Sequence, residues 1–157
     1  MNDVATVLED TATALNVLSN DSDPDGDVLS VSAVTQAAHG SVAVITDGID
    51  VGKVRYTPQA NFFGADTFTY TVSDGKSTAT AAVTITVSNV NDPPVAVNDS
   101  VITPEDTAVS VDVRLNDTDV DGDTLSVTGL STPGKGTAIL LTTGTGRGTY
   151  GIRRTRT

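Results

Sequence analysis

The chain has 157 residues, enough for one typical domain or two small ones. It carries 20 acidic residues against 9 basic ones, a formal net charge of −11, and it contains no cysteine and no tryptophan. This composition excludes a disulfide-stapled small domain and cysteine-ligated zinc or iron–sulfur sites. It also argues against a nucleic-acid partner, because the phosphate backbone attracts Lys and Arg. No apolar run approaches the roughly 18–20 residues of a membrane span, so we expect none in this segment.

The first 90 or so residues predict short β-strands and no convincing helix. Val, Ile, Thr, Tyr and Phe dominate, which suits a pleated, half-buried surface. The expected strands, in chain order, are 4–8, 12–18, 28–35, 41–45, 53–57, 67–72 and 82–87. Turn residues such as Asp25-Gly26 and Asp74-Gly75 separate them. About seven short strands spaced by turns predict an all-β, antiparallel β-sandwich of immunoglobulin type.

The apolar positions of these strands are the predicted core. They are Leu15, Val17, Leu29, Val31, Val42, Val44, Tyr56, Phe68, Tyr70, Val72, Val83, Ile85 and Val87.

An internal repeat organises the chain. Glu9-Asp10-Thr11 recurs 96 positions later as Glu105-Asp106-Thr107, and the same offset holds without a gap over roughly 40 residues. The boundary lies in Asn91-Asp92-Pro93-Pro94, where two prolines make a short, semi-rigid connector. We therefore expect tandem sandwiches, a complete repeat at 1–92 and a second at 93–157 that is truncated and divergent after about 140.

Each repeat contains a loop with four aspartates in seven residues. They are Asp21, Asp23, Asp25 and Asp27 in the first repeat, and Asp117, Asp119, Asp121 and Asp123 in the second. Such carboxylates repel one another unless a cation neutralises them. Calcium takes six to eight oxygens and suits this spacing better than magnesium, and the glycine before the last Asp permits a sharp turn. The alternative is a solvated acidic turn that binds no ion.

The pattern D-x-D-x-D-G matches only the first half of an EF-hand loop. The twelfth position is Ser32 in one copy and Thr128 in the other, where a bidentate Glu belongs. The remaining ligands must therefore come from elsewhere. The candidates are Glu9, its copy Glu105, Asp10, Asp66 and the linker residues Asn91 and Asp92.

The stretches 9–11, 17–27, 56–62 and 64–75 resemble the bacterial immunoglobulin-like and cadherin-like tandem repeats of large surface and RTX-type adhesins. The resemblance covers the first repeat end to end and the second to about Leu140. It implies a β-sandwich, calcium at domain junctions, and a role in adhesion or biofilm at the bacterial cell surface. Such proteins are often exported by a type I system that reads a C-terminal signal.

The cadherin-like resemblance also implies how a junction site would be assembled. Glu9 and Asp66 would come from the upper domain, Asn91 and Asp92 from the linker, and Asp117 and Asp119, with Asp121 and Asp123, from the lower domain. Calcium there would freeze the hinge between domains. The first aspartate loop would serve a junction with a preceding repeat.

The two ends of the chain leave alternatives open. Met1-Asn2-Asp3 has neither the basic nor the apolar region of a secretory signal, which fits export without one, a cytoplasmic protein or a fragment. Where 56–61 should recur, the chain reads 152–157, and four of the nine basic residues fall in the last eleven positions. This is either a basic tail for anionic surfaces or, as we favour, a truncated or frameshifted reading frame. Counterparts of 68–72 and 82–87 are absent, so we expect exposed apolar faces and poor stability of the second domain alone.

Three functions remain compatible with the sequence. With one His and no acid at partnered spacing, a hydrolytic triad is unsupported, and we expect no enzyme. The favoured hypothesis is a calcium-binding stalk or spacer repeat of a surface adhesin, whose partners are calcium and neighbouring repeats of the same chain. The others are a repeat that binds a cell-surface protein or glycan, and an accessory module of a secreted enzyme.

Overall fold

The chain is all-β. The computed structural model describes residues 1–141 and the backbone of 150–153, and it divides the chain into two compact units, unit 1 (Met1–Val90) and unit 2 (Asn91–Thr157). The elements found in the described residues are strands, β1 to β10 in chain order. No helix in this part of the chain is long and apolar enough to cross a membrane.

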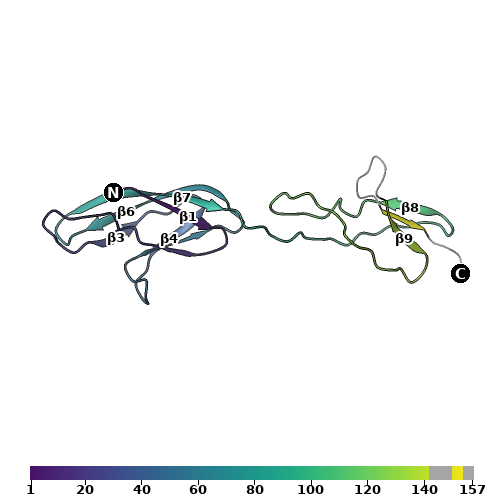
Figure 1. The fold of residues 1–157 in the computed structure, drawn as a ribbon, viewed down its shortest axis with the longest axis horizontal. Coiled ribbons are helices and arrows are strands. Elements are labelled where there is room, and N and C mark those ends of the chain that lie inside the picture. The colour runs from purple at the N-terminus through teal and green to yellow at the C-terminus, as the bar shows by residue number, and fades with distance from the viewer. Residues whose placement is uncertain (142–149, 154–157) are drawn as a thin grey trace. The chain divides into compact units, whose positions relative to one another are not determined.

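Unit 1 contains two sheets (Figure 1). The larger has the order β1-β7-β6-β3, and the smaller has the order β2-β5-β4. The bounds are β1 Asp3–Leu8, β2 Thr13–Leu15, β3 Ser30–Val34, β4 Gly40–Val44, β5 Val54–Pro58, β6 Gly64–Ser73 and β7 Thr78–Ser88. All strand pairs are antiparallel except β1 with β7, which run parallel from Asp3↔Val83 to Leu8↔Ser88. The predicted immunoglobulin-like sandwich is therefore confirmed, with one parallel pair that the sequence did not predict.

The core of unit 1 comes from the alternating apolar positions of the two sheets. Its buried residues are Val7, Val17, Val42, Val54, Tyr56, Phe68, Tyr70, Val83, Ile85 and Val87. Each buried large apolar side chain contributes roughly 1.5–3 kcal/mol. Eight of these ten are in the predicted core. Val7 and Val54 were missed, whereas the predicted Leu15, Leu29, Val31, Val44 and Val72 are only partly buried.

Two strands are shorter than predicted, and one of them is cut short by a turn. The strand expected at 12–18 ends at Leu15, and the chain then turns, with Ser19 N–H donating to the Asn16 carbonyl at 3.4 Å. Val17 nevertheless packs in the core. The strand expected at 28–35 is β3, whose pairing with β6 shifts register between Val31 and Ala33.

The described part of unit 2 repeats the smaller sheet of unit 1. Its order is β8-β10-β9, with bounds β8 Ala108–Val111, β9 Thr137–Leu140 and β10 Tyr150–Arg153. The register is the same at an offset of 96: Leu15↔Val54 becomes Val111↔Tyr150. The structural repeat therefore continues to Arg153, beyond the point near 140 where sequence similarity is lost. Residues 154–157, the rest of the expected basic tail, lie outside the described residues.

Candidate calcium-binding loops and buried carboxylates

In unit 1 the aspartate loop is organised by Asp23. Its Oδ1 accepts the backbone N–H of Asp25 at 2.8 Å and that of Asp27 at 3.1 Å. Gly26 N–H donates to the Asp23 carbonyl at 3.2 Å, and Gly26 adopts a φ of 78°, which favours glycine. One carboxylate oxygen thus fixes the turn. The Asp27 carboxylate faces outward enough to pair with Lys76 Nζ at 2.6 Å.

The loop of unit 2 has the same conformation. Asp119 Oδ1 accepts Asp121 N–H at 3.0 Å and Asp123 N–H at 3.2 Å, and Gly122 has a φ of 77°. The two sequence copies therefore build the same turn twice. In unit 2 the loop also contacts the linker, because Asp92 N–H donates to Asp121 Oδ2 at 2.6 Å.

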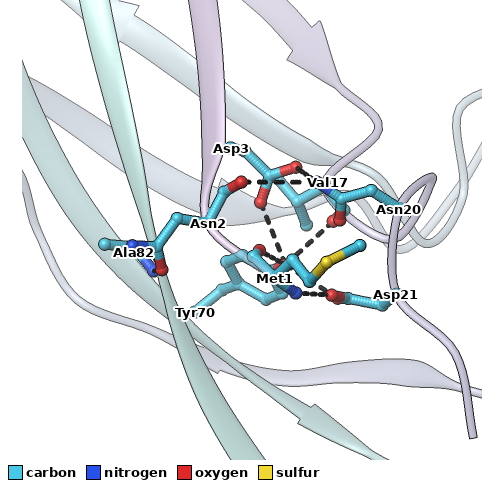
Figure 2. A network of polar contacts seen from close by, with 8 residues as sticks. All are labelled: Met1, Asn2, Asp3, Val17, Asn20, Asp21, Tyr70 and Ala82. Atoms are coloured by element: carbon cyan, nitrogen blue, oxygen red, sulfur yellow. Dashed lines mark hydrogen bonds and ion pairs between the residues drawn. The ribbon is translucent and has the colours of Figure 1, made fainter.

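Figure 2 shows a network of oxygens around the Tyr70 hydroxyl in unit 1. Tyr70 Oη lies 2.7 Å from Asp21 Oδ2, 2.9 Å from the Val17 carbonyl, 3.0 Å from Asp3 Oδ2 and 3.1 Å from the Met1 carbonyl. A phenol has one proton, so it donates to one of these acceptors and leaves the other three without its hydrogen. Burial, reinforced by hydrogen bonds to Asp21 and Asp3, raises the pKa of Tyr70.

The two carboxylates of this network, Asp21 and Asp3, have few hydrogen-bond donors or positive charges around them. The Met1 ammonium pairs with Asp21 Oδ1, and the side chain of Asp21 is only 6% exposed. Asn20 Nδ2 donates to Asp3 Oδ1 at 3.0 Å, while Asn20 Oδ1 is buried and lacks a partner. The network therefore contains many hydrogen-bond acceptors and few donors.

Unit 2 keeps part of this arrangement. Val97 N–H donates to Asp117 Oδ1 at 2.8 Å, at the position that the Met1 amine holds in unit 1. Asn116 Nδ2 donates to the Asn98 carbonyl at 3.3 Å, as Asn20 does to Asn2. No counterpart of Tyr70 is present among the described residues of unit 2, and Asp99 is exposed.

Glu9 is the most deeply buried acid of unit 1. It follows β1 and is 1% exposed. Its Oε1 accepts the Val90 N–H at 2.6 Å, whereas its Oε2 is buried without a partner. Glu105, its copy in unit 2, is exposed. The two glutamates thus occupy different surroundings despite their shared motif.

The linker residues Asn91 and Asp92 also differ from each other. Asn91 is exposed, and its Nδ2 donates to the Asp92 carbonyl at 2.9 Å. Asp92 uses its N–H on the aspartate loop of unit 2, and its Oδ2 is buried without a partner.

Asp66 has a structural role in the core. Oδ1 accepts the N–H groups of Ala38 at 3.1 Å and Thr67 at 2.9 Å, and Oδ2 accepts His39 N–H at 3.0 Å and the Tyr56 hydroxyl at 2.8 Å. Burial raises the pKa of Asp66, but the four hydrogen bonds together outweigh it and leave the pKa lowered. Both oxygens are engaged within unit 1, so calcium ligation by Asp66 stays a prediction to which this geometry adds no support.

The described residues contain no group of three His, Cys, Asp or Glu side chains already arranged to hold a metal ion. They do contain three buried polar side-chain atoms without a hydrogen-bond partner, and all three are oxygens: Glu9 Oε2, Asn20 Oδ1 and Asp92 Oδ2. Sequence reasoning proposed Glu9 and Asp92 but missed Asn20, Asp3 and Tyr70. The repeat offered a signal for two of these, since Asn20 recurs as Asn116 and Asp3 as Asp99.

The two facing sheets of unit 1 define an immunoglobulin-like β-sandwich, and unit 2 repeats its smaller sheet. The sequence profile of a family described as "Bacterial Ig domain" matches residues 1–86 and 91–152. The chain therefore belongs to this family, as a tandem of two repeats.

Individual relatives share only part of their length with this chain. The Arabidopsis thaliana protein "Protein GAMETE EXPRESSED 2" is 38% identical over 81 residues, which are 52% of this chain and 8% of that protein. Among solved structures, a variant of the endo-fucoidan hydrolase MfFcnA4 from glycoside hydrolase family 107 is 24% identical with a TM-score of 0.40. The endo-fucoidan hydrolase MfFcnA9 is 17% identical with a TM-score of 0.36. These matches cover 99% of this chain but 23% and 28% of those chains, and such TM-scores do not establish a shared fold.

Proposed function

We propose that this chain is a non-catalytic, calcium-binding repeat module that serves as a stalk or spacer in an extracellular bacterial adhesin or biofilm protein. Membership of the bacterial Ig domain family supports a surface module. The calcium, the adhesin and the biofilm role are our inferences from the acidic loops and from the resemblance of the sequence.

One observation carries the calcium proposal: the three unpartnered buried side-chain atoms are all oxygens. Burying a polar group without a partner costs roughly 1–3 kcal/mol, and more for a charged group. An unpaired nitrogen would call for an acceptor, but an unpaired carboxylate or amide oxygen calls for a proton or a cation. Calcium is a hard cation that takes oxygen ligands of these types.

The residues fit calcium chemically, although carboxylates alone do not complete a site. Because no three acidic side chains converge among the described residues, the ion would also draw on amide and carbonyl oxygens and on water. In unit 1 the candidates are Glu9 at one place and Asp3, Asn20 and Asp21 at another. In unit 2 they are Asp92 and the aspartate loop.

Binding in unit 2 would have a mechanical consequence. Asp92 is the second linker residue, and it already contacts Asp121 through its backbone. An ion held by this loop and by Asp92 Oδ2 would fix the start of unit 2 to the loop. The chain entering unit 2 would then lose rotational freedom, which is what a stiff spacer requires.

The test is a calorimetric titration of the full chain with Ca²⁺, comparing wild type with Glu9→Gln and with the control Asp47→Asn, which removes an exposed acid outside the loops. Glu9→Gln keeps the shape and removes the buried charge. We expect it to bind calcium at least about tenfold more weakly, a loss of about 1.4 kcal/mol. In chelator, we expect its melting temperature to equal or exceed that of wild type, because an uncompensated buried charge has gone.

Two results would contradict the proposal. One is the absence of saturable calcium binding by the wild-type chain. The other is a Glu9→Gln variant that binds calcium like Asp47→Asn but melts lower in chelator, since the Glu9 carboxylate would then be purely structural.

A further inference from the structure

Unit 1 has four strands at the edges of its two sheets, and three of them are protected against pairing with another chain. β2 and β4 flank the smaller sheet, and β1 and β3 flank the larger one. β2 is only three residues long, and the pairing of β3 with β6 shifts register between Val31 and Ala33. On β4, the Gln36 side-chain amide accepts the Val42 N–H at 2.9 Å and donates to the Val42 carbonyl at 2.9 Å. Short strands, bulges and covered edges all prevent edge-to-edge pairing of β-sheets.

β1 has none of these three features. It is six residues long and pairs with β7 over its whole length without a register shift. Directly after the strand, Glu9 N–H donates to the Ser88 carbonyl on β7. Because successive residues of a strand direct their backbone groups alternately to its two sides, the odd-numbered residues of β1 also bond to β7. The backbone N–H and C=O groups of Val4, Thr6 and Leu8 therefore point to the free edge.

The free edge of β1 is also apolar on its outer face. Val4 is 82% exposed and Leu8 is 51% exposed. The segment 4–8 contains no charged residue and no proline, which are the residues that commonly block an exposed edge. At the offset of 96, unit 2 has Ser100 in place of Val4 and Pro104 in place of Leu8. The apolar, unblocked edge is therefore particular to unit 1.

We propose that unit 1 dimerises through β1, which adds antiparallel to β1 of a second copy of this chain. The register centres on Thr6, so that Thr6 faces the partner's Thr6 and Val4 faces the partner's Leu8. Every facing residue directs its backbone groups to the free edge, so each pair exchanges two hydrogen bonds. The interface is isologous, because the same short segment serves both copies.

The chemistry of β1 selects a second copy as the occupant of this edge. The register is self-complementary: each exposed apolar side chain of 4–8 faces another one, and the central Thr–Thr pair is a favourable cross-strand pair. No like charges face each other within the segment. A lipid surface could cover the apolar side chains, but it would leave the backbone groups of the edge without partners. The inference does not depend on calcium binding.

The experiment is sedimentation equilibrium of the full chain in chelator, combined with amide hydrogen exchange at low and high protein concentration. We expect a reversible dimer that tightens as salt is added, because each copy carries a net charge of −11. Amide protection should rise with concentration at Val4, Thr6 and Leu8. It should stay constant at Ala5 and Val7, whose N–H groups already bond to β7. This alternation is specific to pairing along the edge.

Two variants disrupt the interface by different means. Thr6→Pro removes a backbone donor from the free edge but keeps the ladder with β7, which does not use that N–H. Leu8→Lys replaces an apolar contact with a charge. The control Ile49→Lys makes the same change at a fully exposed residue in the loop between β4 and β5. We expect the first two variants to dimerise at least about tenfold more weakly and the control to dimerise like wild type.

Circular dichroism checks that both variants keep the folded sheet. A wild-type chain that stays monomeric at about 1 mM would overturn the proposal. So would a dimer that folded Thr6→Pro and Leu8→Lys leave intact, or protection that rises equally at all residues of 4–8. A chain that dimerises in chelator but binds no calcium would contradict the proposed function and leave this inference standing.

Discussion

The Tyr56 hydroxyl donates a 2.8 Å hydrogen bond to Asp66 Oδ2 inside unit 1, and it joins β5 of the smaller sheet to β6 of the larger one. Tyr56 is fully buried and Asp66 is 6% exposed. Burial, together with the Asp66 carboxylate, raises the pKa of Tyr56, so the phenol keeps its proton and remains a donor at every physiological pH. The pair is a polar link between the two layers of the sandwich.

Replacing the donor of this pair should destabilise unit 1. Tyr56→Phe leaves the ring in place but removes one of the four hydrogen bonds to Asp66, and we expect a loss of about 1.5–3 kcal/mol, the range for a hydrogen bond to a charged group. Urea unfolding followed by circular dichroism measures this difference. The control is Thr84→Ala on the exposed side of β7, which should stay within about 0.5 kcal/mol of wild type.

The stability of unit 1 should fall with acid in a way that depends on Asp66. Its pKa is lowered in the folded state, so it binds fewer protons folded than unfolded below its ordinary pKa of about 3.9. Its contribution is therefore complete above that pH and is lost as the pH falls through the folded value. Asp66→Asn should be less stable at neutral pH and should show a shallower decline below about pH 4. Urea midpoints from pH 6 downward test this, and parallel curves for the two proteins would contradict it.

Gly40 should not tolerate a side chain, for reasons of space. A Cβ there would lie 2.5 Å from Tyr56 Cε2 and 2.8 Å from the Thr57 carbonyl oxygen, and the backbone atom cannot move without disturbing β5. We expect Gly40→Ala to destabilise unit 1 by about 1–3 kcal/mol through overpacking. Gly134→Ala, where a Cβ meets nothing within 4 Å, is the control for the loss of glycine itself.

The glycines of the two aspartate loops should behave alike for a different reason. Gly26 and Gly122 have φ values of 78° and 77°, and a Cβ at either position meets no neighbour within 4 Å. Alanine at each should cost about 1–2 kcal/mol of backbone strain. If the loops bind calcium as proposed, each variant should also weaken binding at its own loop only. Calcium titrations followed by NMR of the loop amides would detect a variant that instead alters both loops.

The strongest periodic segments were the most predictable parts of the fold. The alternation at 67–72 and 82–87 lies inside β6 and β7, because these central strands bury one face against the smaller sheet. Val7 was missed because its burial depends on the parallel pairing of β1 with a strand 80 residues away, which no local pattern reports. The strand Tyr150–Arg153 was missed because the residues that made the repeat recognisable have changed there. Its backbone pairing with the neighbouring strands nevertheless persists.

The candidate site was predictable in its residue types and less so in its partners. The repeated Asp-Gly loops were visible from spacing, and both form the same turn. Asp66 looked like another free acid in the sequence, but the fold gives it four donors from separate segments. Asn20 and Tyr70 carried no acidic signal. Folding brings the Tyr70 hydroxyl to Asp21 and the Asn20 amide to Asp3.

The parallel pairing of β1 with β7 also determines how unit 1 responds to tension. The chain enters the ladder at Asp3 and leaves it at Ser88, and these residues pair at opposite ends of the six-residue register. A pull on the two termini of the unit therefore runs along the strands, and it loads the hydrogen bonds between them in shear. In this geometry the bonds must fail together, whereas a force applied at one end of a hairpin unzips them one at a time. Unit 1 is thus built to resist extension along its own strands.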